Sequence, residues 1–256
     1  MGVAAHALNP PAAAIEIVHA DDALVAVNKP AGLLVHRSAI AADETDFLLE
    51  RLQAQLGGNV YLAHRLDRAT SGVLLLARSR EIAGLLGRQF MAREVTKRYL
   101  AVVRGWPAAQ GEIDYALPDV REKGPRKPAL TRWRTLGTAT LPIALGRYPE
   151  QRYALVEALP ETGRYRQIRR HFHHVSHHIL GDTSHGRGDH NRLWRIEFAM
   201  HRLLLHAWRL ELRHPLTGAA LRLEAGLDAT WRKILARFGW EDAVAGDAAC
   251  VAGPVR

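Results

Sequence analysis

Short apolar runs bounded by turn residues make up much of the chain, and several have the alternating or continuous apolar character of β-strands. The Lys-Pro-Ala-Gly segment at 29–32 separates two of these runs as a turn. Residues 73–77, VLLLA, are apolar throughout, which predicts a strand buried on both faces. The expected strands are 15–20, 24–30, 32–36, 73–77, 97–106, 129–137, 152–159 and a hairpin within 203–227 that turns at HPLTG.

Four further segments carry apolar residues at helical spacing. Ser79 and Asp228 stand where the N-caps of two of these helices are expected. The four helices are expected within 43–57, 79–94, 162–178 and 228–240. Strands and helices alternate too irregularly for a regular βαβ fold, and the helices exclude an all-β fold. We therefore expect an α+β domain with a largely antiparallel sheet.

The two ends of the chain lack periodicity and anchoring residues. We expect a flexible N-terminal tail at 1–14, one folded domain at 15–241 and a flexible C-terminal tail at 242–256. The single cysteine, Cys250, excludes a disulfide framework and a zinc ribbon. No apolar run approaches the roughly 20 residues of a membrane span, and the N-terminus lacks a signal-peptide pattern, so we expect a cytoplasmic protein.

The charge balance is unusual for an ordinary globular protein and favours a polyanionic partner. Among the 256 residues, 35 Lys and Arg stand against 26 Asp and Glu, which leaves a formal charge of +9. Such an excess favours a nucleic-acid partner and salt-dependent binding. The alternative is a generally arginine-rich composition with no such partner.

The segment AHRLDRATSGVLLLARS, 63–79, places Asp67 between Arg65 and Arg68, just ahead of the apolar strand. A nearby arginine, which stays protonated, would keep this carboxylate ionised for chemistry on an anionic substrate. A surface ion pair is the simpler interpretation of these three residues taken alone.

Two other segments carry candidate chemistry. Tyr99 follows two cations in an expected strand, where its ring either stacks on a nucleobase or fills the core. Four arginines crowd the expected start of the third helix, the end at which the helix dipole disfavours cations; they are Arg164, Arg166, Arg169 and Arg170. They indicate either an anion site or a solvated basic face. Arg169 follows Ile168 beside the apolar stripe, so we expect it to reach inward to a buried acid.

The histidines of this helix offer metal-ligand spacings, His171/His174 and His174/His178, without an obvious third ligand. We expect solvated or RNA-facing histidines and no metal. A serine hydrolase is disfavoured because the chain has no G-x-S-x-G motif. A nucleotide cofactor is disfavoured because it has neither a Walker A motif nor G-x-G-x-x-G.

Taken together, five segments resemble the pseudouridine synthases of the RluA family. They are HRLDRATSGVLLLA (64–77), KRYLAVVRG (97–105), TGRYRQIRRH (162–171), ILGD (179–182) and LLLHAWRL (203–210). LVAVNKPAGLLVH (24–36) is also similar to that family's first strands. One departure is Arg166-Gln167, where the family usually has His-Gln, although the expected Arg169 is in place.

The resemblance implies a pseudouridine synthase fold, with a mixed, mostly antiparallel central sheet, flanking helices and a catalytic cleft. It also implies roles for individual residues. Asp67 would attack the target nucleoside, Tyr99 would stack on the uracil and is a candidate for proton transfer, and Arg169 would hold Asp67 charged and oriented. Leu205 would line the base pocket, and Arg65 would enter the RNA helix in place of the everted uridine. His64 and Thr70 would brace the loop, and Arg164 and Arg166 would contact RNA.

The implied reaction converts a uridine of RNA to pseudouridine by breaking an N-glycosidic bond and forming a C–C bond. It needs no cofactor and no metal, because no redox or phosphoryl transfer occurs. Softer features, such as GRYP (146–149) and HPLTG (214–218), resemble the members of the family that modify uridine 65 of tRNA, and this resemblance implies that target. The alternatives are the same reaction on ribosomal RNA and a non-catalytic RNA-binding protein. No obligate protein partner is evident, and we expect the domain at 15–241 to start without a preceding S4 RNA-binding module.

Overall fold

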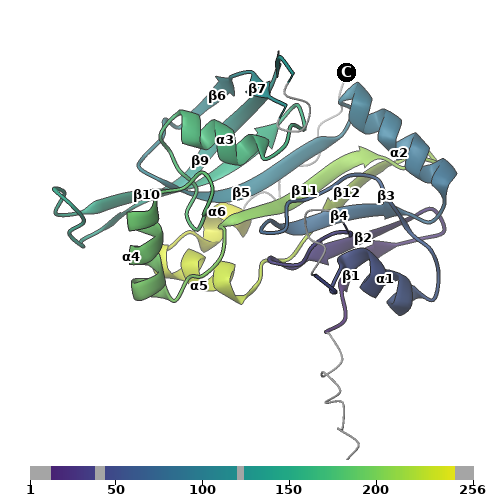
Figure 1. Cartoon of the computed structure of the whole chain (residues 1–256), viewed down its shortest axis with the longest axis horizontal. Coiled ribbons are helices and arrows are strands. Elements are labelled where there is room, and N and C mark those ends of the chain that lie inside the picture. Colours follow the sequence, from purple (N-terminus) through teal and green to yellow (C-terminus); the bar gives the residue numbers. More distant parts are fainter. Residues whose placement is uncertain (1–12, 38–43, 120–123, 246–256) are drawn as a thin grey trace, which may run out of the picture.

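The computed structural model describes residues 13–37, 44–119 and 124–245. Within these ranges the chain forms a ten-stranded sheet, a small two-stranded sheet and six helices (Figure 1). The strands are β1 (Glu16–Ala20), β2 (Leu24–Lys29), β3 (Tyr61–Leu62), β4 (Ser71–Ala77), β5 (Thr96–Arg104), β6 (Gln110–Asp114), β7 (Leu117–Pro118), β8 (Arg126–Lys127), β9 (Leu130–Leu141), β10 (Gln151–Pro160), β11 (Leu205–Arg213) and β12 (Ala220–Glu224). The helices are α1 (Leu48–Leu56), α2 (Arg80–Ala92), α3 (Gln167–His174), α4 (Gly188–Phe198), α5 (Ala229–Phe238) and α6 (Glu241–Ala245).

The large sheet follows the strand order β1-β2-β4-β11-β5-β10-β9-β6, with β3 also paired to β4 and β12 to β11. In the described part of the chain β4 and β11 run parallel, and the other pairs are antiparallel. The predicted α+β class with a mostly antiparallel sheet is therefore confirmed. The parallel pair matters for function because it sets the start of β4 beside the start of β11, with Ser71 opposite His206.

Strand β4 is buried along its whole length because helices cover both of its faces. Leu74 and Leu76 pack into the cluster under α1, whereas Val73 and Leu75 pack into the cluster under α2. Successive side chains of a strand point to opposite faces, so a strand covered on both sides needs apolar residues at every position. The prediction made from VLLLA is confirmed.

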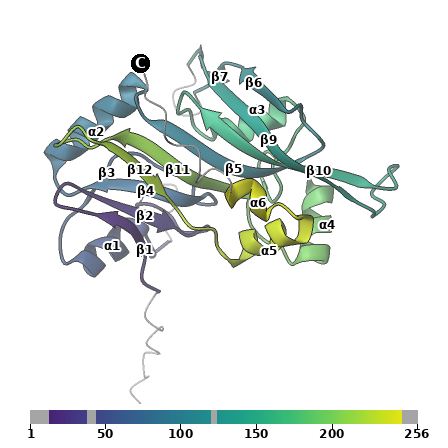
Figure 2. The same cartoon turned by 180° about the vertical axis from the view of Figure 1, so that it is seen from behind.

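The other half of the sheet is covered in the same way. Helix α3 packs Ile168 and Phe172 against β5 and β10 on one face, and α4 and α5 pack Trp194 and Trp231 on the other. Tyr99 of β5 contacts both the cluster under α1 and the cluster under α3. Figures 1 and 2 show α4, α5 and α6 together at one end of the sheet, and the end of the β9–β10 hairpin extends beyond the rest of the molecule.

Both expected N-caps are confirmed. Ser79 Oγ accepts a hydrogen bond of 3.2 Å from the Ile82 backbone NH, and Asp228 Oδ1 accepts one of 3.1 Å from Trp231. These side chains satisfy backbone donors that the first helical turn leaves without partners. No helix in the described ranges is both long enough and apolar enough to cross a membrane.

Two expectations differ from the structure. The strand expected at 32–36 is wrong, because in this segment Leu34 makes an isolated bridge to Phe47 and no strand forms. The segment is apolar because Leu33 and Val35 are buried in the cluster under α1, a burial that requires no strand pairing. At the other end, residues 242–245 of the expected tail belong to helix α6, which packs against the core. Residues 1–12 and 246–256 of the expected tails lie outside the described residues.

Candidate active site

The loop between β3 and β4 carries Asp67 and is held by buried hydrogen bonds. The Thr70 backbone NH donates to the Asp67 carbonyl oxygen at 3.1 Å and closes a turn. The fully buried Lys29, at the end of β2, donates from Nζ to the carbonyl oxygens of Arg68 at 3.0 Å and Leu33 at 2.7 Å. His64 Nε2 accepts a hydrogen bond of 3.0 Å from a backbone NH of β4. The loop is thus tied to two strands of the sheet.

Gly72, which follows this loop, allows the backbone of β4 to lie very close to the backbone of β11. Gly72 has φ +112°, and a Cβ atom there would lie 2.1 Å from the Ala207 carbonyl oxygen. Only glycine tolerates both this backbone conformation and this contact with β11. The Thr-Ser-Gly sequence after Asp67 therefore serves the parallel pairing of β4 with β11, which fixes the loop relative to β11.

Arg169 of α3 holds the side chain of Asp67. Its Nη1 donates to Asp67 Oδ2 at 3.0 Å, across 102 residues of sequence. The Arg169 side chain is 5% exposed and that of Asp67 is 24% exposed. The carboxylate of Asp67 is therefore accessible from the cleft, whereas the guanidinium group of Arg169 is buried. The inward reach of Arg169 expected from the helix pattern is confirmed.

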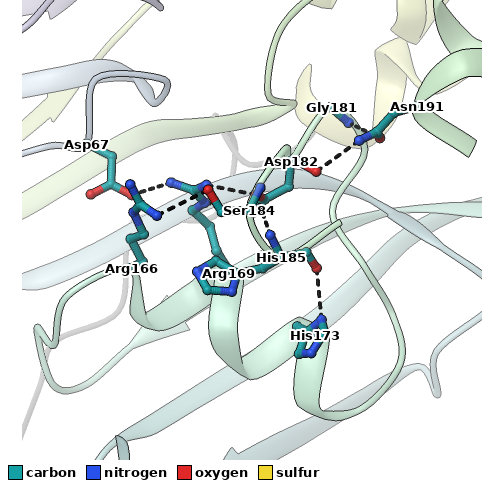
Figure 3. A network of polar contacts seen from close by, with 9 residues as sticks. All are labelled: Asp67, Arg166, Arg169, His173, Gly181, Asp182, Ser184, His185 and Asn191. Carbon is teal, nitrogen blue, oxygen red and sulfur yellow. Dashed lines mark hydrogen bonds and ion pairs between the residues drawn. The ribbon is translucent and has the colours of Figure 1, made fainter. Parts of the chain in front are cut away.

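A second carboxylate, Asp182, fixes Arg169 from the other side. Arg169 Nε and Nη2 donate to the two oxygens of Asp182 at 2.7 Å each (Figure 3). Asp182 Oδ1 also accepts from the backbone NH groups of Ser184 and His185 at 2.9 Å, and Asn191 Nδ2 donates to the Asp182 carbonyl oxygen. Nε and Nη2 of Arg169 thus form a bidentate pair with Asp182, and Nη1 remains to bind Asp67.

The charges of this network reinforce one another. Burial on its own would raise the pKa of Asp182, but Arg169 and the two backbone NH groups hold that pKa below its usual value. Burial would also lower the pKa of Arg169, and the hydrogen bonds to Asp182 and Asp67 raise it instead. Arg169 is therefore a permanent buried cation beside Asp67.

Tyr99 lies in the same cleft as Asp67. Burial, and then the nearby charge of Asp67, raise the pKa of its phenol above the usual value. The phenol consequently keeps its proton at neutral pH, which suits a group that donates a hydrogen bond or a proton. Its ring rests on the apolar clusters under α1 and α3.

A single cleft of about 880 Å³ brings the predicted site residues together. It is lined by all nine of them, namely His64, Arg65, Asp67, Thr70, Tyr99, Arg164, Arg166, Arg169 and Leu205. Its volume lies in the range of pockets that accept small organic molecules, about 300–1,000 Å³. Arg93 and Lys97 add two more cations to the lining, so the cleft suits a base carried on a polyanion. The roles implied by the resemblance stay predictions.

The sequence predicted that all four arginines lie at the start of the helix, but two of them precede α3. Helix α3 begins at Gln167, so Arg164 and Arg166 precede it. Arg166 occupies the N-cap with φ +50°, and its Nη1 donates to Ser184 Oγ at 3.2 Å. The helix cannot include Arg166, because its positive φ is left-handed, and the Gln167 side chain accepts a hydrogen bond of 3.0 Å from the Arg164 NH in the turn before the helix. Arg169 and Arg170 do lie in the first turn.

Arg68, the second arginine beside Asp67 in the sequence, belongs to a different ion pair. Its Nη1 lies 2.6 Å from Glu44 Oε1, and its Nε donates to the Gly32 carbonyl oxygen. The carboxylate that sequence proximity would assign to Arg68 is instead held by Arg169. Neighbours in a loop commonly point apart, so adjacency in the sequence is weak evidence for an ion pair.

Asp182 and Lys29 were not among the site residues predicted from the sequence. Asp182 is the last residue of the ILGD segment, and Lys29 lies in the NKP turn, so both lie within segments that carried the resemblance. Nothing in the local pattern shows that the Asp182 carboxylate turns toward Arg169 or that Lys29 is buried. The signal that could have identified both residues was a charged side chain just after an apolar run, since a charge in such a position is often buried with a partner.

The expectation of solvated histidines is wrong for His171, which is fully buried and donates from Nε2 to the Tyr115 carbonyl oxygen at 3.0 Å. Its burial follows from the apolar face that α3 presents to the sheet. His173 and His174 are exposed on the last turn of the helix. No three His, Cys, Asp or Glu side chains in the described ranges are grouped to hold a metal ion.

Known proteins resemble this chain over most of its length. Residues 23–174 match a family model described as RNA pseudouridylate synthase. The tRNA pseudouridine synthase C of Salmonella typhi is 47% identical over 235 residues, 88% of this chain and 90% of that protein. The protein of that name from Vibrio cholerae is 45% identical over 239 residues, 90% of this chain and 98% of its own length. A third, from Pectobacterium carotovorum, is 47% identical over 89% of this chain, but the match spans only 63% of its length.

Solved structures share the fold. Human RNA Pseudouridylate Synthase Domain Containing 4 matches with a TM-score of 0.66 and 26% identity, over 88% of this chain and 93% of that one. Human RNA Pseudouridylate Synthase Domain Containing 1 matches with a TM-score of 0.64 and 23% identity, over 90% and 97%. The mixed sheet with its flanking helices is thus the fold of these domains.

Proposed function

This chain belongs to the RNA pseudouridylate synthase family, and on that premise we propose that it isomerises uridine 65 of tRNA to pseudouridine. The observation that carries the proposal is the contact of 3.0 Å between Asp67 and Arg169 in a cleft that also contains Tyr99. The reaction needs an ionised carboxylate in a fixed orientation and an aromatic group near the base. Asp67, held by Arg169, and Tyr99 provide these two groups.

Asp67 acts as the attacking carboxylate. The reaction breaks the glycosidic bond between C1′ and N1 of the uridine, turns the base, and joins C1′ to C5. C5 loses a proton to solvent and N1 gains one, and the bond that Asp67 forms to the nucleoside breaks again before the product, an isomer of the substrate, is released. Arg169 keeps Asp67 charged and fixes the orientation of its carboxylate, so the nucleophile needs little rearrangement when the substrate arrives. The atoms balance without an external redox or phosphoryl donor.

The target uridine leaves the RNA helix to reach Asp67, because a base in the stack is inaccessible to the cleft. The Tyr99 ring stacks on the flipped uracil, and Leu205 lines the base pocket from the start of β11. The exposed Arg65 enters the gap in the RNA helix, while His64 and Thr70 hold the loop from which it projects. Arg164 and Arg166, which also line the cleft, contact phosphates.

The choice of tRNA rests on the relatives, whose names state that substrate at 43–47% identity. We place the reaction in the cytoplasm and propose that the chain acts without an obligate protein partner. Purified protein should therefore be active by itself. Ribosomal RNA is the alternative substrate for the same site.

The test uses a tRNA transcript that lacks modifications and carries tritium at C5 of its uridines. Wild-type protein should release tritium, and Asp67→Asn should not. The matched control is Asp242→Asn on α6, an exposed carboxylate outside the cleft, which should match wild type. A transcript in which position 65 is changed to cytidine should release none.

Substrate class is settled separately by mapping pseudouridines in a strain that lacks the gene. Loss at position 65 of tRNA alone supports the proposal. Loss in ribosomal RNA alone assigns the alternative substrate. Equal tritium release by wild type and Asp67→Asn would overturn the catalytic assignment, and RNA binding without tritium release by wild type would indicate a non-catalytic RNA-binding protein.

A further inference from the structure

A second pocket, of about 390 Å³, lies beside the paired strands β7 and β8 and helix α3 and shares no lining residue with the active-site cleft. Its polar and aromatic lining consists of Tyr115, Arg126, Arg170, His173, His174 and His185. Nothing in the proposed reaction uses these side chains. Arg169 and Arg170 are neighbours on α3, yet Arg169 lines the cleft and Arg170 lines this pocket.

Within the described ranges, two guanidinium groups of this pocket, those of Arg126 and Arg170, form no ion pair with an acidic side chain. Arg126 donates from Nη1 to the Ala116 carbonyl oxygen at 3.3 Å, and Arg170 donates from Nη1 to the carbonyl oxygens of Pro118 and Tyr165 at 3.2 and 3.3 Å. Among the described residues that line the pocket there is no carboxylate. Burial and then the charge of Arg126 lower the pKa of Arg170, because like charges at close range disfavour each other. An anion between them would relieve this repulsion.

The pocket wall is ordered in advance of any ligand. The Tyr115 ring stacks on His174 with 3.6 Å between ring centroids and 14° between planes, and the Arg126 guanidinium carbon lies 5.1 Å from the centroid of the Tyr115 ring. His173 Nδ1 donates to the His185 carbonyl oxygen at 3.0 Å. In Figure 3 one branch of the polar network runs from Asp182 through His185 to His173, away from Asp67. Ordered donors bind an anion at a smaller entropic cost than mobile ones.

We propose that this pocket binds a phosphodiester group of the substrate RNA outside the target nucleotide. Guanidinium groups match the geometry of phosphate oxygens, and histidine ring nitrogens add further donors. An RNA chain carries a phosphate at every nucleotide, so a strand whose target base lies in the cleft has further phosphates to place on either side of α3. The inference rests on the proposed function in one respect, that RNA is the partner.

The test measures the affinity of the full-length chain for the unmodified tRNA transcript at several salt concentrations. Arg126→Gln/Arg170→Gln should raise the Kd about tenfold and lower the slope of log Kd against log salt by about one to two. The single-turnover rate at saturating RNA should stay at the wild-type value, since the pocket lies outside the cleft. The matched control is Arg232→Gln/Arg237→Gln on α5, which removes two exposed arginines and should leave the Kd within about twofold.

Two further variants keep the result interpretable. Arg126→Gln by itself removes an exposed side chain with one backbone contact, so it should fold normally and lose part of the affinity. Arg126→Lys/Arg170→Lys keeps the charge and should recover much of the salt slope. A Kd and slope equal to wild type in both glutamine variants would overturn the inference. Tritium release by wild type on the same transcript shows separately whether the proposed function holds.

Discussion

Asp182 holds Arg169 through two hydrogen bonds of 2.7 Å, and this grip leaves Nη1 of Arg169 directed at Asp67. The arginine is a rigid, buried link between two carboxylates of different exposure. Asp182 is almost completely buried, whereas Asp67 faces the cleft. The buried carboxylate therefore orients the arginine, and the accessible one is free to meet substrate.

Changing Asp182 to asparagine should lower activity although this residue touches no substrate. The variant removes the charge that Arg169 pairs with and weakens its orientation toward Asp67. We expect the single-turnover rate to fall at least about tenfold, with the RNA Kd within about twofold of wild type, and the free energy of unfolding to fall by about 3 kcal/mol. Tritium-release kinetics, filter binding and urea unfolding measure the three quantities. Asp189→Asn, which breaks an exposed pair with Arg187 on α4, is the control and should leave all three near wild type. A loss of affinity at an unchanged rate would contradict this role.

Replacing Arg169 by alanine should cost more activity than binding. The change leaves two carboxylates near each other without their shared cation, so Asp67 loses both its charge partner and its fixed geometry. We expect the single-turnover rate to fall by about a hundredfold or more and the Kd to change only a few-fold. Arg169→Lys keeps the charge but has a single donor head in place of the fork, so it should recover only part of the rate. An Arg169→Ala protein that loses tRNA affinity but keeps its rate would refute the assignment.

Two substitutions of Tyr99 should distinguish a role in stacking from a role in proton transfer. Tyr99→Phe keeps the ring and removes the phenol, whose raised pKa keeps it protonated at neutral pH. If the phenol moves a proton, the single-turnover rate should fall by about a hundredfold or more while the RNA Kd stays near wild type. Tyr99→Leu removes the aromatic face as well and should weaken binding too. A Phe variant with the wild-type rate would restrict Tyr99 to stacking.

The protein should lose stability as the pH falls from about 6.5 to about 4, and His206 should account for part of that loss. Burial lowers the pKa of His206 to about 4, and its neutral ring fits between the Ser71 hydroxyl at 2.8 Å and the Ala225 carbonyl oxygen at 3.2 Å. Within that pH range the unfolded chain takes up a proton at this histidine and the folded chain does not. The folded state is therefore disfavoured by about 3 kcal/mol at the acid end.

Urea unfolding of His206→Gln at several pH values measures this contribution. The variant should be less stable than wild type near pH 7, but its stability should fall less steeply on acidification. His201→Gln, an exposed histidine, is the control and should keep the wild-type pH dependence. Parallel pH curves for wild type and His206→Gln would show that His206 does not contribute.

The apolar pattern predicted the elements that local chemistry decides. The two helix caps at Ser79 and Asp228 were found because a cap is made within one turn of chain. The fully buried strand β4 was found because a strand covered on both faces has no polar positions. The segment at 32–36 was misjudged because an apolar run can be buried as a loop, and burial by itself does not determine pairing.

Some contacts of the site were predicted from the sequence, and others were not. The inward reach of Arg169 followed from its place beside the apolar stripe of α3, and the resemblance named Asp67 as its partner. The ion pair of Arg68 with Glu44, the burial of Lys29 and the grip of Asp182 on Arg169 had no local signature. Each depends on the direction of a side chain relative to a distant segment.

Local sequence patterns established the α+β class and the helix starts at Ser79 and Asp228, because periodicity and caps act over a few residues. The set of residues that line the cleft came from the resemblance to the RluA family. The tertiary structure added that Asp182 also holds Arg169 and that Arg68 pairs with Glu44. Asp67 and Arg169 are 102 residues apart, and they meet because Gly72 lets β4 pair closely with β11 while α3 packs on the same sheet. Contacts of that separation arise from the packing of whole elements, which no short stretch of sequence specifies.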